Sequence, residues 1–263
     1  MKMNKIVSTV ALLAITGNVL MAGGDIAPVE PVVPEVVASN GWEYSASIYL
    51  FMPSIDIETA KGEDLDLSFS DILDNLNFTF MGTLGAQKGK WGFLADVIYM
   101  DLEDGINYSP GPLERLDVTS IGMKSWVVTP MVTYRVMESD QLDLDLLAGA
   151  RYLYIKIPID YTTPLLGPGS TSRSNDVWDG IVGARGTYDL NEKWFMQGHL
   201  DVGTGDTEVT WQAFAGVGYK YENFDLIAGY RHLEWDFDNG DTGGDRLNDL
   251  SMSGPIIGAK FNF

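Results

Sequence analysis

Two histidines are the main candidates for acid–base chemistry in this chain of 263 residues. His199 alternates with Gln197 and Asp201, and His232 lies close to Glu234 in the sequence. An imidazole beside a carboxylate can act as a general base when the two groups are within hydrogen-bond distance. His232 also alternates with Tyr230, which favours a place on the outward face of a strand.

The sequence offers little support for thiolate, metal-dependent or phosphate-binding sites. The absence of cysteine excludes thiolate catalysis and cysteine-based metal sites. Residues 236–245 resemble a calcium loop in composition, but they lack the spacing and the final glutamate of an EF-hand. No glycine-rich phosphate loop, nucleophile elbow or zinc-binding helix motif is present. The sequence therefore predicts no catalytic residues, no metal site, no cofactor and no enzyme activity.

The elements that carry these residues are β-strands, because polar and apolar side chains alternate with period two from Trp42 onward. Most of the predicted strands have the roughly 9–11 residues that a tilted strand needs to cross a bilayer. Ten strands are predicted, with eight as the alternative count. They are 42–52, 78–87, 91–101, 120–136, 141–155, 177–188, 193–202, 208–221, 224–235 and 250–263.

Alternation alone does not say which face points inward, since a soluble barrel would bury the apolar face. Three features favour a membrane barrel. Short turns alternate with longer connections such as 53–77, 102–119 and 156–176. Aromatic residues collect at the strand ends on the apolar face. An even strand count places both termini on the periplasmic side. The predicted fold is an all-β, antiparallel, up-and-down transmembrane barrel.

The N-terminal residues indicate export. Lys2 and Lys5 precede an apolar stretch that ends in small residues, which predicts a signal peptide over residues 1–24, cleaved after Ala22 or Gly24. Residues 25–40 contain three prolines and predict an extended periplasmic linker, followed by the barrel at 41–263. The net charge of −20 becomes −22 once the two lysines leave with the signal peptide, so nucleic acid is an unsuitable partner.

The C-terminal strand carries a second indication of location. Ile257, Ala259, Phe261 and Phe263 alternate along one face and end in an aromatic residue. This pattern resembles the insertion signal of outer-membrane barrels, which predicts contact with the barrel-assembly machinery. Outer-membrane lipid and lipopolysaccharide are the other expected partners, and the oligomeric state is left open.

Several motifs carry a family resemblance that runs from about Trp42 to Phe263. They are Ser68–Asn77, Phe80–Gly82, Lys90–Gly92, Ala95–Tyr99, Leu147–Tyr152, Trp211–Ala213 and Ser253–Pro255. Together they resemble a widespread, largely uncharacterised group of Gram-negative outer-membrane β-barrel proteins. The resemblance implies the fold and a place in the cell outer membrane, and it transfers no catalytic residues.

Within the first motif, Ser70 is predicted to cap a short helical turn that carries Ile72, Leu73 and Leu76. Such a turn could fold into the barrel mouth as a partial plug. Packing on the rim is the preferred alternative.

If the apolar faces meet lipid, the polar faces line the lumen. Side chains of both charge signs then face one another, either as an ion-pair network or along a narrow water-filled path. No large apolar core is expected there. The lumen candidates are Glu43, Asp96, Asp143, Asp145, Arg151, Asp179, Arg185, Gln197, His199, Asp201, Gln212, Lys220, Arg231 and Lys260.

Three functions follow from these observations. The favoured one is a non-enzymatic outer-membrane barrel with a structural role or a narrow passive pore for small solutes. The first alternative is a surface interaction or adhesion protein that uses its acidic outer loops. The remote alternative is a hydrolase at the rim, built around His232, which would require this side chain to turn inward against Glu234 or Asp236.

Overall fold

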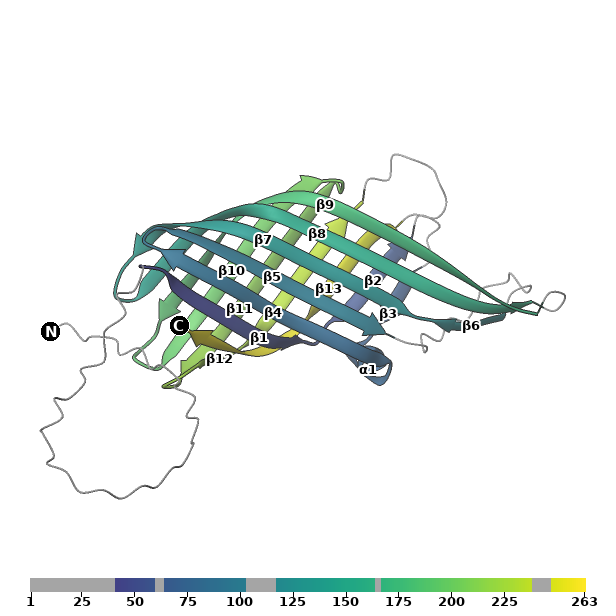
Figure 1. Ribbon diagram of the computed structural model, residues 1–263, viewed down its shortest axis with the longest axis horizontal. Coiled ribbons are helices and arrows are strands. Elements are labelled where there is room, and N and C mark those ends of the chain that lie inside the picture. The colour runs from purple at the N-terminus through teal and green to yellow at the C-terminus, as the bar shows by residue number, and fades with distance from the viewer. Residues whose placement is uncertain (1–40, 60–63, 103–116, 164–166, 238–246) are drawn as a thin grey trace, which may run out of the picture.

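The computed structural model describes residues 41–59, 64–102, 117–163, 167–237 and 247–263 (Figure 1). Ten antiparallel strands close into one ring in the order β1-β4-β5-β7-β8-β9-β10-β11-β12-β13. Their bounds are β1 Glu43–Phe51, β4 Leu76–Lys88, β5 Trp91–Leu102, β7 Met123–Glu138, β8 Leu142–Thr163, β9 Gly167–Asp189, β10 Trp194–Gly205, β11 Val209–Lys220, β12 Asp225–Asp236 and β13 Leu247–Asn262. The signal peptide, the linker and most of the 236–245 loop lie outside the described residues.

The ring confirms the ten predicted strands and shows that the alternative count of eight is wrong. It closes between β1 and β13, which pair from Ser45 opposite Asn262 to Phe51 opposite Ile256. Beyond the last pair, the backbone N–H of Phe263 donates to the carbonyl oxygen of Tyr44 at 2.9 Å. Closure leaves the ring without an open strand edge at this level, as a bilayer requires.

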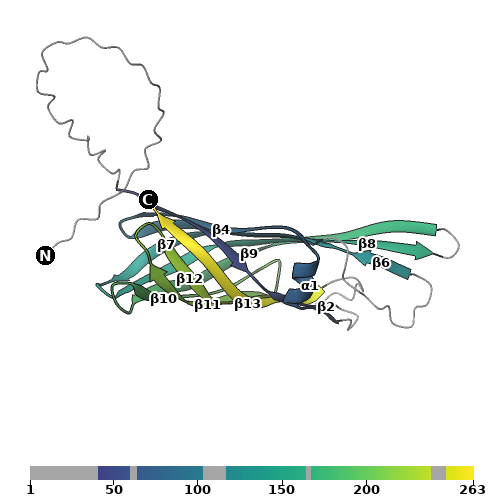
Figure 2. The ribbon, with the colours of Figure 1, turned by 90° about the horizontal axis from the view of Figure 1, so that it is seen from below.

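Connection lengths separate the two ends of the barrel. At one end the turns are tight: the Tyr221 N–H donates to the carbonyl oxygen of Phe224 at 2.9 Å across the β11–β12 turn. The C-terminus lies at this same end, and the end of β8 and the start of β9 lie at the opposite one (Figure 2). Short turns and the C-terminus mark the periplasmic end, and the long connections mark the outer end.

Three short strands were not predicted: β2 (Ser54–Thr59), β3 (Asp64–Leu67) and β6 (Asp117–Ile121). β2 continues β1 upward along the outer part of β13, where Ser54 lies opposite Ser253. Between the two segments the Met52 N–H donates to the carbonyl oxygen of Pro255 at 2.9 Å. Since proline has no N–H to donate, β13 tolerates this interruption in the pairing.

Helix α1 (Phe69–Asp74) follows β3, but its cap differs from the prediction. Ser68 is the N-cap, and its hydroxyl accepts a hydrogen bond from the Asp71 N–H at 3.3 Å. The Asp71 carboxylate in turn accepts from the Ser68 N–H at 3.1 Å, which completes a capping box. The prediction of Ser70 as the cap is therefore wrong, because the carboxylate partner at the third helical position fits Ser68. Leu76 belongs to β4.

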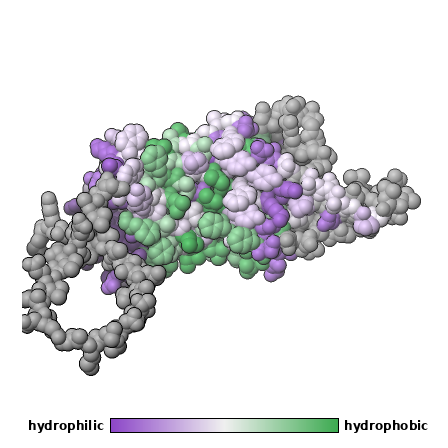
Figure 3. Space-filling model, viewed as in Figure 1, coloured by the Kyte–Doolittle hydropathy of each residue, from purple (hydrophilic) through white to green (hydrophobic). Residues whose placement is uncertain are grey.

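The outer surface of the barrel carries an apolar belt. Figure 3 shows hydrophobic side chains across the middle of the visible face, with hydrophilic ones toward the ends. Leu84, in this belt, is 66% exposed. Aromatic pairs flank it, Trp91 with Tyr134 on the periplasmic side and Tyr99 with Trp126 on the outer side. Apolar side chains this exposed require lipid, so the soluble alternative is wrong.

Helices provide no route across the membrane in the part of the chain that the structure describes. None there is both long and apolar enough to span a bilayer.

The β8–β9 hairpin projects past the other strands at the outer end (Figures 1 and 2). β7 pairs with β8 only as far as Lys124 opposite Lys156. Beyond that point β8 pairs with β6, from Ile121 opposite Ile159 onward, and with β9. We call β6 together with residues 157–163 and 167–173 the outer arm.

The outer half of the lumen is filled by 20 buried hydrophobic side chains. The expectation that the lumen holds no large apolar core is therefore wrong. Most inward-facing positions in the outer halves of the strands are apolar, although Ser125 is buried among them. Ile72 of α1 packs into the same cluster, so this segment helps to fill the mouth instead of lying only on the rim. The outer core consists of Phe51, Ile55, Ile57, Leu67, Ile72, Met81, Ile98, Met100, Leu102, Met123, Val127, Leu153, Ile155, Val177, Leu233, Trp235, Phe237, Leu250, Met252 and Ile256.

Candidate functional site in the barrel lumen

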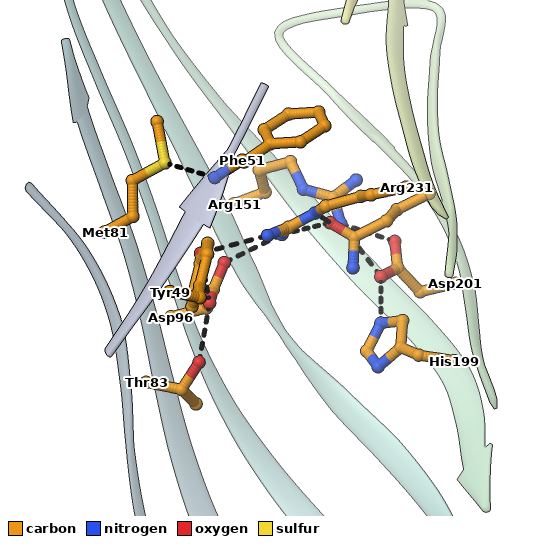
Figure 4. Close-up of polar contacts among 10 residues, drawn as sticks. Tyr49, Phe51, Met81, Thr83, Asp96, Arg151, His199, Asp201 and Arg231 are labelled. Carbon is orange, nitrogen blue, oxygen red and sulfur yellow. Dashed lines mark hydrogen bonds and ion pairs between the residues drawn. The ribbon is translucent and has the colours of Figure 1, made fainter. Parts of the chain in front are cut away.

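A polar layer crosses the lumen beneath the outer core (Figure 4). At its centre Arg231 of β12 donates to Asp96 of β5 at 2.7 Å and to the Gln212 side-chain oxygen at 2.6 Å. The Asp96 carboxylate also accepts from the hydroxyls of Tyr49 and Thr83, both at 2.8 Å. Four strands besides β12 therefore hold one arginine in place.

A second group lies beside the first. Arg151 of β8 makes a two-pronged contact with the Asp201 carboxylate of β10, at 2.7 and 2.8 Å, and donates to the Thr210 hydroxyl at 3.0 Å. Nε2 of His199 lies 2.6 Å from Oδ2 of the same carboxylate, an oxygen that also accepts from Arg151. The side chains of Arg151 and Asp201 are 0% exposed. The histidine is thus positioned by a carboxylate that a buried arginine already neutralises.

A third group lies nearer the periplasmic end. Arg135 of β7 contacts both Asp143 and Asp145 of β8, and Arg185 of β9 lies 3.5 Å from Asp145. Asp145 is buried, but the side chains of Asp143 and Arg185 are 42% and 29% exposed, more than those of the central layer. Screening by water makes such pairs weaker contributors to stability.

The two central groups lie across the lumen and join β12 to β5 and β8 to β10. Buried ions are tolerated only where paired charges and further hydrogen bonds replace their water shells, as they do around Arg231 and Arg151. The outer core packs directly above, because Phe51, Leu233 and Trp235 follow the polar layer outward along β1 and β12. The pairing in this layer is incomplete, because the buried Nε of Arg151 has no hydrogen-bond partner among the described residues.

Below the layer, on the periplasmic side, lies a cavity of about 190 Å³. The cavity is lined by Tyr49, Thr83 and Asp96 at the polar layer and extends toward Lys260 at the periplasmic end of β13. Among the predicted lumen residues, those that line it are Asp96, Arg185, Gln197, His199, Gln212, Arg231 and Lys260. We call this space the periplasmic vestibule.

The remaining predicted lumen residues lie elsewhere on the inner face. Asp179 is buried, and its carboxylate accepts from the Thr207 N–H at 3.0 Å in the β10–β11 turn. Lys220 pairs with Asp189 at 2.7 Å near the periplasmic end. Glu43 is exposed at the start of β1. The structure brings these residues to the lumen side without joining them into one site, and any role in lining a passage stays a prediction.

Sequence reasoning missed Tyr49, Thr210 and Arg135 as members of the network. Tyr49 alternates with Ser45 and Ser47, so the polar face of β1 was visible in the sequence. The aromatic ring of Tyr49 reads as apolar in such a pattern, although its hydroxyl lies at the centre of the network. Arg135 was hidden because it lies close to the tight β7–β8 turn.

The proposed insertion residues lie on the outward face. Ile257, Phe261 and Phe263 are exposed, as a contact surface for lipid or an assembly factor requires. Their role in insertion stays a prediction. His232 also lies outward, where its alternation with Tyr230 places it. Among residues 41–59, 64–102, 117–163, 167–237 and 247–263, no cluster of three or more histidines and acids could hold a metal ion.

No protein-family model and no curated protein sequence matches the chain. Among solved structures, it is similar to the attachment invasion locus protein Ail of Yersinia pestis, with 14% identity, a TM-score of 0.35, and coverage of 85% of this chain and 99% of that one. It is similar to the toluene transporter TbuX of Ralstonia pickettii, with 10% identity, a TM-score of 0.37, and coverage of 84% and 89%.

The translocator domain of the autotransporter NalP from Neisseria meningitidis is a third similar structure, with 13% identity, a TM-score of 0.40, and coverage of 84% and 88%. The features that decide the class of this chain are its own: a closed ring of ten antiparallel strands, a lipid-facing apolar belt between aromatic girdles, and a polar layer inside. The chain is an outer-membrane β-barrel protein of the Gram-negative type.

Proposed function

We propose that this protein is a sealed outer-membrane barrel with a structural role, and that it does not act as a passive pore. One observation carries the proposal: the ion pairs of Arg231 with Asp96 and of Arg151 with Asp201 lie directly beneath a dry outer core. A pore needs a continuous water-filled path, and both layers interrupt it.

Planar-bilayer recording tests the seal. We expect the refolded wild-type barrel to give no discrete conductance steps, and Arg151→Ala and Arg185→Ala to be equally silent, because the outer core remains above either substitution. A known porin in the same bilayer is the positive control, and the mobility shift of the folded barrel on a gel verifies folding. Discrete steps that change with either substitution would contradict the sealed barrel and identify a lumen passage.

A second function is favoured by the outer arm. Its strands are hydrogen-bonded to one another beyond the rest of the barrel, and Ser170, Ser172 and Ser174 on β9 are exposed. An ordered, polar structure held away from the membrane suits contact with another surface better than support of the barrel itself. A sealed barrel would then serve as the anchor for a surface interaction protein.

Shortening the hairpin tests this second function. Lys156 and Ser174 are cross-strand partners, so residues 157–173 can be replaced by an Asn-Gly turn that joins β8 to β9 directly. We expect the shortened barrel to fold and insert, while cells that display it adhere to glass and to epithelial monolayers only as well as cells without the protein. Adhesion equal to that of the wild type would remove the arm from any surface role.

A further inference from the structure

A serine, a histidine and a glutamate form a hydrogen-bonded chain on the outward face of β12 and β13. The Ser253 hydroxyl oxygen lies 2.6 Å from Nδ1 of His232. The other ring nitrogen, Nε2, lies 2.8 Å from the Glu234 carboxylate. Both distances are within the range that couples a nucleophile to its base and the base to an orienting carboxylate.

Strand register assembles the three residues. His232 lies directly opposite Ser253 in the β12–β13 pairing, and Glu234 follows two positions later on the same face of β12. The Trp211 ring of β11 stacks against the imidazole with a centroid distance of 4.4 Å. The histidine ring is therefore held on two edges and one face. His232 contacts Glu234 while its side chain faces outward. The rim-hydrolase hypothesis from the sequence required this side chain to turn inward for the same contact.

The position of this chain of contacts suits a lipid substrate. Trp211 belongs to the outer aromatic girdle, which also contains the tilted ring pair of Tyr152 and Trp178. Aromatic girdles lie at the headgroup level, where the ester bonds of membrane lipids also lie. The side chains of His232 and Glu234 are 26% and 34% exposed, so both are open to that region.

An apolar surface extends from the serine toward the middle of the membrane. Tyr230 and Pro255 are exposed next to His232 and Ser253, and Ile257 follows along β13. An acyl chain lying along this surface would bring its ester group to the level of Ser253. The exposed apolar residues would contact the acyl chain of a lipid, and the polar hydrogen-bonded group would contact its ester.

We propose that Ser253, His232 and Glu234 form a hydrolytic site for acyl esters of outer-leaflet lipids. The substrate class is a fatty acyl ester held at the membrane interface, which either a glycerophospholipid or lipopolysaccharide can supply. This activity is separate from the sealed lumen, because the three side chains face away from it.

The reaction balances with water as the only co-reactant. The Ser253 hydroxyl oxygen attacks the ester carbonyl carbon while its proton passes to Nδ1 of His232. The carbon–oxygen bond to the alcohol then breaks, and the alcohol leaves with the proton from Nδ1. Water attacks the acyl-serine with His232 as base, which releases the fatty acid and restores the Ser253 hydroxyl. The Glu234 carboxylate accepts a hydrogen bond from the Nε2–H group throughout and is not itself protonated, so it orients the ring and stabilises its charged form.

The test uses the whole barrel, refolded in detergent micelles, with the p-nitrophenyl ester of a long-chain fatty acid and a fluorophosphonate probe. We expect hydrolysis above the blank and covalent attachment of the phosphonate to Ser253, located by mass spectrometry. Ser253→Ala should abolish both. His232→Gln should slow hydrolysis by about 10²–10⁴-fold, the typical contribution of a general base.

Glu234 acts through His232 and is therefore a positioning residue. Its test must measure the reactivity of Ser253, because a loss of folding alone would also lower the activity. Glu234→Gln should lower the rate at which the fluorophosphonate labels Ser253, and Glu234→Asp should restore part of that rate. Ser251→Ala is the matched control, because the Ser251 hydroxyl lies on the same face and donates to Asp56 instead, at 3.2 Å. This control should leave hydrolysis and labelling unchanged.

Two further arms separate the lipid sources: vesicles of glycerophospholipid, and vesicles that contain lipopolysaccharide, each assayed for released fatty acid. Release from either one supports the proposal and names the source. The proposal is overturned if the folded wild-type barrel hydrolyses none of the three esters and leaves Ser253 unlabelled. Activity that survives Ser253→Ala would also overturn it.

Discussion

Arg231→Met is expected to lower the free energy of unfolding by about 3–5 kcal/mol, the usual cost of removing one partner from a buried ion pair. The variant leaves the Asp96 carboxylate beneath the outer core with only the hydroxyls of Tyr49 and Thr83 as partners. Neither hydroxyl carries a positive charge. Urea unfolding of the barrel in micelles, followed by tryptophan fluorescence, measures the change.

Two variants make this prediction specific. Arg185→Met should cost much less, because Arg185 is more exposed and lies 3.5 Å from Asp145. Arg231→Met combined with Asp96→Leu should recover most of the loss, since no unpaired charge remains. Equal effects of Arg231→Met and Arg185→Met would show that the central layer is as hydrated as the periplasmic end, contrary to a sealed lumen.

Trp235→Ala is expected to have an effect of similar size, about 3–5 kcal/mol, through the cavity that it leaves in the outer core. Trp235 is 0% exposed and is enclosed by side chains from several strands, which cannot all move inward to fill the space. Because the substitution removes a fluorophore, unfolding is best followed by the gel mobility of the folded barrel across a urea series.

Trp178→Ala provides the comparison for this second variant. Trp178 is 52% exposed on the outward face, where lipid or water can occupy the vacated volume. We expect a smaller loss there, limited to the transfer of the side chain and its contact with Tyr152. A loss at Trp235 no greater than that at Trp178 would mean that the outer half of the lumen is loosely filled.

The barrel itself could be predicted because the crossing strands share one local pattern over their periplasmic halves, polar inward and apolar outward. The short strands and the outer arm were not predicted, because their sequences are too short or too polar to show this pattern. β2, β3 and β6 have four to six residues, too few for alternation to stand out. The outer arm is polar on its exposed positions, so Ser170 and Ser172 read as loop residues although their backbone continues β9.

The outer core was missed for a different physical reason. In the outer half of β5, both faces carry large apolar or aromatic side chains, such as Ile98 and Tyr99. A two-sided apolar strand is compatible with lipid on one side and a packed interior on the other. The alternation rule assumes that one face is polar, and it therefore gives no information on what fills the lumen there.

The outward-facing group of Ser253, His232 and Glu234 shows a third limit of prediction from the sequence. Alternation correctly placed His232 on the outward face, and Glu234 shares that face by spacing alone. Ser253 lies 21 residues further along the chain and meets the imidazole only through the β12–β13 register. Register depends on how two strands and their loop fit together, and the loop between them has no pattern that sets it.

The vestibule and the seal also divide the lumen electrically. In the sealed barrel that we propose, the cavity below Arg231 faces the periplasmic end, whereas the outer core above it is an apolar, weakly polarisable medium. A voltage across the membrane would therefore fall mainly over the outer half of the barrel, and not evenly along its length. The Arg231 and Asp96 pair lies at the start of that steep field, so only a charge carried from this pair to the outer surface would cross nearly all of the applied potential.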